Sequence, residues 1–186
     1  AVGGLKMPLF SQNLLFTSFL TLIFLSLSMR FNKLTMNNEI LQPFTSDYFM
    51  KEALKEALLA FEKDEVPVGS VVVWRNRIIA RAHNLTETLN DPTAHAEMQA
   101  ITSETNAIGG KYLNECTLYV TLEPCPMCAG ACFWAQLGSL VYGADDTKRG
   151  YSFLNPKLLH PKTVVEKGVM GKECAKLMVD FFKKKR

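Results

Sequence analysis

Cysteine, histidine and tryptophan are all scarce in this sequence. It holds only five cysteines, three histidines and two tryptophans among its 186 residues. Five cysteines are too few for a disulfide framework, and the number is odd. Hydrophobic residues make up 48% of the chain and charged residues 21%, which excludes a disordered chain and a collagen-like repeat. The composition predicts one globular domain that is long enough to bury a core.

The chain also lacks an apolar run of transmembrane length in its most hydrophobic segment, residues 14–27. A transmembrane helix needs about 20 residues, whereas this run fits the core of a secretory signal that follows Lys6. Alternatively, the run belongs to a segment that results from a mistaken or too-early start, because the sequence that opens at Met36 is polar. We favour the second interpretation and treat residues 1–35 as an N-terminal extension outside a domain at 36–186. A metal site with reduced thiols then predicts a cytoplasmic protein without a stable membrane partner.

Charge is distributed unevenly along the chain. Residues 36–143 hold 7 basic and 13 acidic residues, whereas residues 144–186 hold 11 basic and 5 acidic residues. The basic end, 183–186, has two interpretations. It is a solvated helix end whose charge complements the helix dipole, or it binds a polyanionic partner. Charge alone favours the first.

The hydrophobic pattern predicts helices that alternate with strands. We expect helices at 46–63, 93–103, 124–136 and 172–182, strands at 71–74, 78–80, 117–121 and 139–143, and loops at 83–92 and 144–162. Ser46 is the expected N-cap of the first helix. This order predicts a layered α/β domain with a crossover-connected sheet.

Three cysteines lie within eight positions, and the first two form a pair at a predicted helix start. Cys125 and Cys128 are spaced i, i+3, so both sulfurs face one side of the first turn. A helix N-terminus also favours the thiolate that a metal needs. Alone, the pair fits a catalytic metal site no better than it fits a structural zinc site or a redox pair. His95 adds a third ligand and leaves the fourth position of a zinc ion open for water.

Glu97 lies two residues after His95, and the two side chains would point about 200° apart on a regular helix. If His95 lies in the half-formed first turn, Glu97 can face the water and move its protons without binding the metal. The combination of His-x-Glu with Pro-Cys-x-x-Cys is the signature of zinc-dependent nucleobase deaminases. Cys132 could be a stray ligand, but we favour a small buried residue. His83 and His160 are expected in surface or loop positions.

Four stretches of this sequence carry a resemblance to a known family. They are Glu65–Gly69, Asp91–Glu97, Leu118–Ala131 and Val141–Ala144, and the likeness runs from about Asp47 to Arg186. The chain resembles the bacterial tRNA-specific adenosine deaminases of the cytidine deaminase-like superfamily. The Thr-Leu-Glu-Pro-Cys-x-Met-Cys string and the helix around Asp180-Phe181-Phe182 narrow the resemblance to the tRNA enzymes.

The resemblance implies a three-layer α/β/α fold with a five-stranded mixed sheet and a homodimer. It also implies hydrolytic deamination of adenosine 34 to inosine in a tRNA anticodon loop, with one Zn²⁺ per subunit. The implied roles are as follows: His95, Cys125 and Cys128 bind zinc, Glu97 transfers protons, Asn84 contacts the flipped nucleoside, Val68 lines the base pocket, and Asp146 contacts the RNA.

The implied substrate residues each have a simpler interpretation. Asn84 fits a loop turn, Val68 fits core packing, and Asp146 fits a solvated acid. Asp145 departs from the pattern, because many relatives have a basic or neutral residue there. Two other functions also remain open. One is a free nucleobase or nucleoside deaminase of guanine or cytosine type, since Phe133-Trp134-Ala135 is similar to the guanine deaminases. The other is a structural zinc module that binds RNA.

Overall fold

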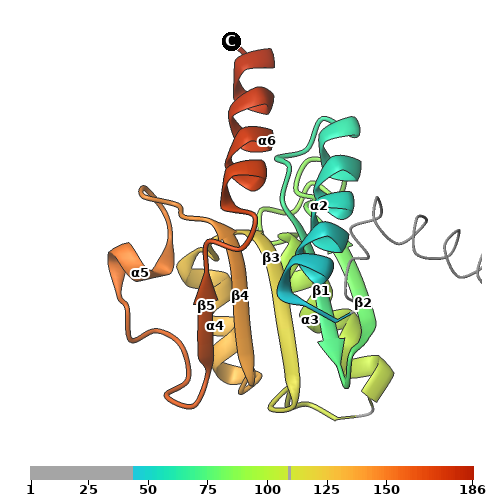
Figure 1. Ribbon diagram of the computed structural model, residues 1–186. Coiled ribbons are helices and arrows are strands. Elements are labelled where there is room, and N and C mark those ends of the chain that lie inside the picture. The colour runs from blue at the N-terminus through green and yellow to red at the C-terminus, as the bar shows by residue number, and fades with distance from the viewer. Residues whose placement is uncertain (1–43, 109) are drawn as a thin grey trace, which may run out of the picture. The chain divides into compact units, whose positions relative to one another are not determined.

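The computed structural model describes residues 44–108 and 110–186, all within one unit at Gln42–Arg186 (Figure 1). Its elements in chain order are α2 (Ser46–Glu62), β1 (Gly69–Trp74), β2 (Arg77–His83), α3 (Ala96–Ile108), β3 (Cys116–Leu122), α4 (Pro126–Trp134), β4 (Ser139–Ala144), α5 (Tyr151–Leu154), β5 (Val164–Lys167) and α6 (Gly171–Lys184). The apolar run at 14–27 and the extension at 1–35 lie outside the described residues. The domain boundary at residue 36 therefore stays a prediction.

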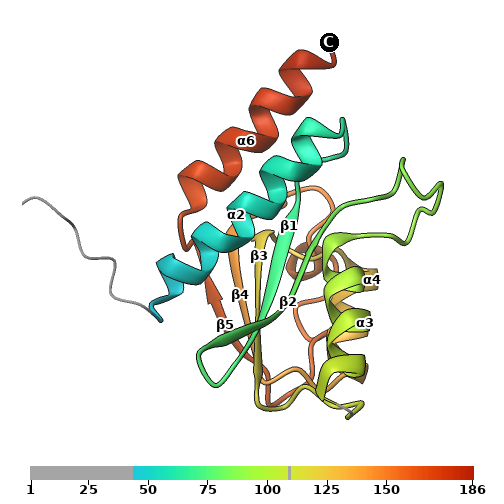
Figure 2. The same ribbon diagram turned by 90° about the vertical axis from the view of Figure 1, so that its right-hand side faces the viewer.

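The strands form one five-stranded mixed sheet in the order β2-β1-β3-β4-β5. β1 is antiparallel to both β2 and β3, whereas β3, β4 and β5 are parallel to one another. Helices α2 and α6 cover one face, and α3 and α4 cover the other (Figure 2). The predicted three-layer α/β/α fold with a five-stranded mixed sheet is therefore confirmed.

Alternating apolar residues divide the core between the two faces of the sheet. Val71 and Val73 pack with Phe49 and Met50 of α2, whereas Val72 packs with Leu118 and with residues of α3 and α4 on the opposite face. This alternation follows from the two-residue period of a strand. Both faces of β1 are covered, because five of its six residues are buried.

Helix α2 lies very close to the start of β1. A Cβ atom at Gly69 would lie 2.2 Å from the backbone oxygen of Ala53 and from the backbone nitrogen of Ala57. Real side chains do not approach backbone atoms so closely, so glycine is needed at this crossing. At the other end of β1, Arg75 and Asn76 form the hairpin turn with positive φ angles of 48° and 61°. Two left-handed residues are typical of the type I′ turn that joins antiparallel strands.

The helix and strand boundaries differ from the sequence predictions in several places. The N-cap of α2 is Thr45, whose Oγ1 accepts a hydrogen bond from Tyr48 N at 3.2 Å, so the prediction of Ser46 was wrong by one residue. Helix α3 begins one residue after His95 and continues to Ile108. Helix α4 ends at Trp134, before Gln136 adopts a left-handed φ of 51°.

Two short elements and one histidine were not predicted correctly. The expected loop at 144–162 contains α5, and β5 was not predicted from the pattern. His83 is not a loop residue. It is the last residue of β2, and its ring nitrogens lie 3.1 Å from Glu56 Oε2 and 3.0 Å from Lys63 Nζ. Within 44–108 and 110–186, no helix has the length and apolar content that a membrane span requires.

Candidate active site

The sheet topology gathers the candidate residues at one edge. β3 and β4 are parallel and end at this edge, while β1 begins there and β2 ends there, with Gly69 opposite His83. Gly69 N donates to Thr121 Oγ1 at 3.1 Å, which joins the start of β1 to the end of β3. Residues that directly follow β2, β3 and β4, or precede β1, therefore meet here. They include Val68, Asn84, Cys125 and Asp146.

The turn before α3 holds His95 at the helix start. Asp91 Oδ1 accepts hydrogen bonds from Thr93 N at 2.8 Å and from Thr93 Oγ1 at 2.7 Å, which closes the turn. The carbonyl of His95 then accepts from Gln99 N at 3.0 Å, as an N-cap residue does. Ser70 Oγ donates to the carbonyl of Ala96 at 2.9 Å and ties this helix start to β1. His95 thus has a fixed position before the regular helix begins.

Helix α4 begins directly after Cys125. Pro126 occupies the first turn, where its missing N–H costs nothing, and Cys125 is the N-cap with extended backbone. The Cys125 side chain makes no capping hydrogen bond, so its sulfur is available for another partner. Cys128 follows three residues later on the same side of the first turn and is fully buried.

These two helix starts bring three ligand atoms together. The sulfurs of Cys125 and Cys128 are 3.7 Å apart. His95 Nδ1 lies 3.6 Å from the Cys125 sulfur and 3.5 Å from the Cys128 sulfur. All three atoms lie within 4.8 Å of one another, so this group could hold a metal ion.

The protonation preferences of this group suit a cation. The hydrogen bond with Cys128 lowers the pKa of the Cys125 thiol to about 4, and His95 acts in the same direction. Cys128 has a raised pKa, because the shared hydrogen bond and burial keep its proton in place. The hydrogen bond to Cys125 raises the pKa of His95, with a contribution from nearby Glu97. The lowered pKa of Cys125 favours its thiolate form, which a bound cation would stabilise.

Glu97 lies in the first turn of α3, beside the three ligand atoms. Its side chain is buried, with 4% exposed, and forms a hydrogen bond with Cys128. Burial raises the pKa of this carboxyl, and the nearby Cys125 thiolate raises it further. A buried carboxyl whose pKa is shifted toward neutrality is suited to accept and release protons. Glu97 therefore lies next to the three potential metal ligands and is not one of them.

Asn84 and Val68 form the neighbouring part of the edge. Asn84 N donates to the Val68 carbonyl at 3.0 Å, and both side chains are buried. The Asn84 amide nitrogen donates to Glu65 Oε2 at 3.1 Å and to Thr86 Oγ1 at 2.9 Å. The Asn84 side chain therefore belongs to a buried hydrogen-bond cluster with Glu65 and Thr86, which a simple turn residue would not form.

Asp146 is the second residue of the loop that follows β4. Its Oδ1 accepts from the backbone N–H groups of Lys148 and Arg149, both at 3.0 Å, so the side chain closes a turn that exposes two basic residues. The buried Glu123 holds this loop from beneath. It accepts from Asp146 N at 3.0 Å, and from Ser152 N at 3.0 Å and Ser152 Oγ at 2.6 Å.

Cys132 lies one turn beyond Cys128 and is fully buried. It is not part of the three-residue group, and it packs in the core with α4 and the sheet, as expected of a small apolar residue. Burial raises its pKa, which keeps the thiol protonated. His160 lies in the loop after α5, with its ring centroid 5.6 Å from that of Phe133.

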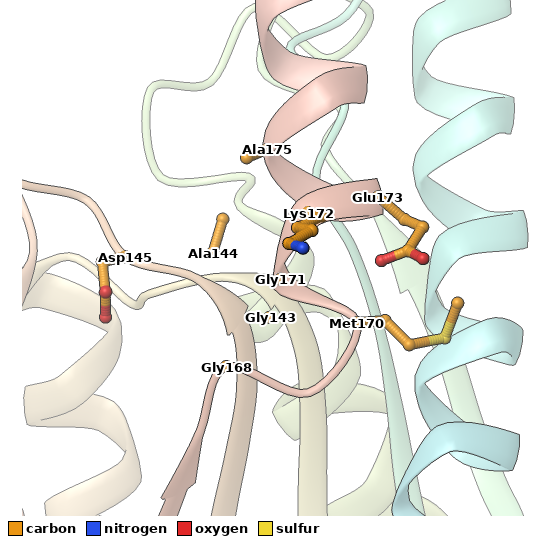
Figure 3. Close-up of a pocket in the computed structure, with 9 residues that line it drawn as sticks. All are labelled: Gly143, Ala144, Asp145, Gly168, Met170, Gly171, Lys172, Glu173 and Ala175. Atoms are coloured by element: carbon orange, nitrogen blue, oxygen red, sulfur yellow. The ribbon is translucent and has the colours of Figure 1, made fainter.

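A separate hollow of about 590 Å³ opens beside the start of α6 (Figure 3). Its lining includes Gly143 of β4 and Asp145 just after it, and Lys172 and Glu173 of α6 with the N-cap residue Met170. None of the potential ligands or Glu97 lines it. The candidate active site is therefore defined by its side-chain chemistry at the α3 and α4 helix starts, and not by this hollow.

Comparison with known proteins identifies the family. A family model described as MafB19-like deaminase matches residues 44–186. A tRNA-specific adenosine deaminase of Bacillus subtilis (strain 168) is 46% identical over 145 residues, which cover 75% of this chain and 90% of that protein. The chain belongs to the tRNA-specific adenosine deaminase family.

Solved structures agree with this family. A structure from a study of A-to-I editing by tRNA:A34 deaminases is 44% identical, with a TM-score of 0.65, and the match covers 70% of this chain and 98% of that one. A guanine deaminase from Bacillus subtilis is 35% identical, with a TM-score of 0.55, and covers 63% and 79%. The tRNA-specific adenosine deaminase family is thus the more similar of the two.

Two buried acids at this edge, Glu65 and Glu123, received no role from the sequence. A signal was present, because each lies within a stretch that carries the family resemblance and each directly precedes a short motif with proline. Their partners follow 19 to 29 residues later in the chain, so the local pattern did not identify what they bind.

Proposed function

We propose that this chain is a zinc-dependent deaminase that converts adenosine to inosine at wobble position 34 of a tRNA. The observation that carries the proposal is the group of His95, Cys125 and Cys128 with the buried carboxyl of Glu97 beside it. The identity of 46% to a tRNA-specific adenosine deaminase supports the same substrate. One Zn²⁺ per subunit would be held by the three ligands.

The spacing of the ligand atoms fits zinc. In a tetrahedral site, zinc bond lengths place two sulfurs about 3.8 Å apart, and a sulfur and a nitrogen about 3.6 Å apart. The corresponding distances in this chain are 3.7 Å for the sulfur pair, and 3.6 Å and 3.5 Å for the two pairs with His95 Nδ1. Three protein ligands leave one position open, which is typical of catalytic zinc sites.

Glu97 performs the proton transfers in the proposed reaction. Zinc in such a site supplies Lewis acidity that makes water a nucleophile near neutral pH. Glu97 takes a proton from the attacking water and delivers it to N1 of the adenine ring, while the water oxygen bonds to C6. Glu97 then takes the proton of the new C6 hydroxyl and passes it to the amino group, the C6–N bond breaks as the C6 carbonyl forms, and ammonia leaves inosine behind. Its raised pKa suits it to both steps.

The loops around this group supply the proposed RNA contacts. We assign Asn84 to the flipped nucleoside, Val68 to the base pocket and Asp146 to the anticodon-loop RNA. The Asp146 turn exposes Lys148 and Arg149, which suits phosphate contacts. Helix α6 starts at the carboxyl end of β5 and extends away from the sheet to the exposed basic residues 183–186 (Figure 1). These charges favour a polyanionic substrate.

We also propose that the enzyme is a cytoplasmic homodimer. Large apolar side chains are exposed on α4 and α5, with 79% of Trp134, 68% of Phe153 and 61% of Leu154 accessible. Burial of such residues against a second copy would offset their exposure. The two thiol ligands must stay reduced to bind zinc, which supports the cytoplasm. Light scattering should give twice the mass of one chain, and Trp134→Glu should shift the mass toward a monomer.

The central test measures inosine by mass spectrometry. The full-length chain, loaded with zinc, is incubated with an anticodon stem-loop that carries adenosine 34. We expect inosine at that position and one zinc per subunit, and we expect Glu97→Ala to retain zinc but to form no inosine. Normal turnover by Glu97→Ala would remove Glu97 from the mechanism.

Guanine deamination is the second candidate function, supported by the 35% identity to a guanine deaminase. The same preparation is therefore assayed with free guanine and cytidine. Turnover of either free compound without stem-loop editing would replace the tRNA proposal. Strong inhibition of turnover by added salt would favour the RNA substrate, because phosphate contacts depend steeply on ionic strength.

A further inference from the structure

Glu65 is a buried acid that makes no ion pair within the described residues. It lies between α2 and β1, its exposed fraction is 0%, and no lysine, arginine or histidine lies within ion-pair distance. A buried charge is tolerated only when hydrogen bonds replace its lost hydration. Its hydrogen-bond donors come from the loop that follows β2, at residues 84–88, and they include the side chain of Thr88.

These donors are distributed over both carboxylate oxygens. Thr88 N donates to Oε1 at 2.7 Å. Asn84 Nδ2 at 3.1 Å, Glu87 N at 3.1 Å and Thr86 Oγ1 at 3.2 Å donate to Oε2. Burial raises the pKa of Glu65, but the backbone N–H groups of Thr88 and Glu87 outweigh it and the net shift is downward. Glu65 is therefore ionised at neutral pH and acts only as an acceptor.

An acceptor at this place determines which way the Asn84 amide faces. The amide nitrogen must point to Glu65, and it also donates to Thr86 Oγ1 at 2.9 Å. The amide oxygen of Asn84 accepts no hydrogen bond from the described residues. The side chain is 5% exposed, at the same sheet edge as the three ligand atoms. Its oxygen is the polar atom left to meet a substrate.

We propose that Glu65 is a positioning residue for deamination, which orients Asn84 so that its amide oxygen accepts a hydrogen bond from the bound nucleoside. The inference rests on the proposed function. The same carboxylate fixes the loop backbone through Glu87 and Thr88, so the orientation of Asn84 and the position of the loop are set together. Loss of the carboxylate frees the amide to turn and present a donor where an acceptor is needed.

The test is a double-mutant cycle on inosine formation in the anticodon stem-loop. Glu65→Gln and Asn84→Ala should each lower kcat/KM by about 10- to 100-fold, since small misplacements of substrate-positioning groups have effects of this size. If Glu65 acts through Asn84, the double variant should be no worse than Asn84→Ala alone. Zinc content should stay at the wild-type value in all three variants, which separates positioning from metal loss.

A matched control and a milder variant complete the test. Glu62→Gln removes the same charge from an exposed position three residues earlier and should leave kcat/KM unchanged. Thr86→Val removes one hydroxyl from the cluster, and it should also have no added effect in an Asn84→Ala background, even if Glu65→Gln fails to fold. Losses that multiply in the double variants would overturn the inference. A wild-type chain that edits no stem-loop would instead overturn the proposed function and this inference with it.

Discussion

Replacement of Glu123 by glutamine tests how the loop after β4 is held. The wild-type carboxylate, with 4% exposed, accepts one hydrogen bond from Asp146 and two from Ser152. In Glu123→Gln, an amide oxygen that faces Ser152 can keep both of the Ser152 hydrogen bonds. The amide nitrogen then faces the N–H of Asp146, so two donors oppose each other. The substitution thus removes one charge-assisted hydrogen bond and leaves one donor unpaired.

The magnitude follows from the value of a hydrogen bond to a charged group. Such a bond contributes about 1.5–3 kcal/mol, and Asp146 is only partly buried, so water can replace some of the loss. We expect the free energy of unfolding to fall by about 2 kcal/mol. For a chain of this length, that change corresponds to a decrease in Tm of about 4–8 °C.

Two measurements on the zinc-loaded protein check this prediction. Calorimetry gives the Tm, and hydrogen exchange followed by mass spectrometry should show faster exchange in the peptide that covers residues 146–152, with no change in α2. Glu173→Gln is the matched control, because Glu173 is exposed and makes no hydrogen bond within the described residues. It should change the free energy of unfolding by less than about 0.5 kcal/mol. If Glu123→Gln matches this control in both assays, the inference that Glu123 holds the loop after β4 in place is refuted.

Three further predictions concern the core, the metal and acid stability. Leu118→Ala should lower the free energy of unfolding by about 2–5 kcal/mol in urea denaturation, because Leu118 is fully buried in the central strand. Removal of metal by a chelator should abolish inosine formation, and added zinc should restore it; activity that survives complete removal would contradict the zinc assignment. The pKa of Glu65 is held below its ordinary value of 4.5, so its ionised form stabilises the fold at neutral pH and this contribution is lost as the pH falls through the lowered pKa. The stability gap between wild type and Glu65→Gln, measured by urea midpoints, should therefore narrow in acid, whereas a gap independent of pH would show that the carboxylate charge is not involved.

Elements with a strong hydrophobic period could be predicted from the sequence. Helix α2 follows its predicted segment because its apolar residues recur at helical spacing, and β1, β3 and β4 follow theirs because each is a short, almost continuously buried apolar run. The cysteine pair of the candidate metal site could also be predicted to lie together, since Cys125 and Cys128 are local to one helix turn. The resemblance supplied the fifth strand and the order of layers, which the pattern alone did not reach.

Elements without such a period could not be predicted. All four residues of β5 are exposed, so no alternation marks this edge strand. Helix α5 has four residues, which is about one turn and too short for a periodic signal. The hydrogen-bond partners of Glu65 and Glu123 lie in loops that only strand pairing brings near these acids. Only the register of β1 with β2, and of β3 with β4, brings each acid to its loop.

The polarity of the sheet has a practical consequence. Every candidate site residue lies where β3 and β4 end, whereas the tight turn at Arg75 and Asn76 lies at the far end of β1. A dye, an affinity handle or a surface tether attached at that hairpin tip would sit about a strand's length from the candidate site. Enzyme immobilised in this way would then expose the candidate site to the solution.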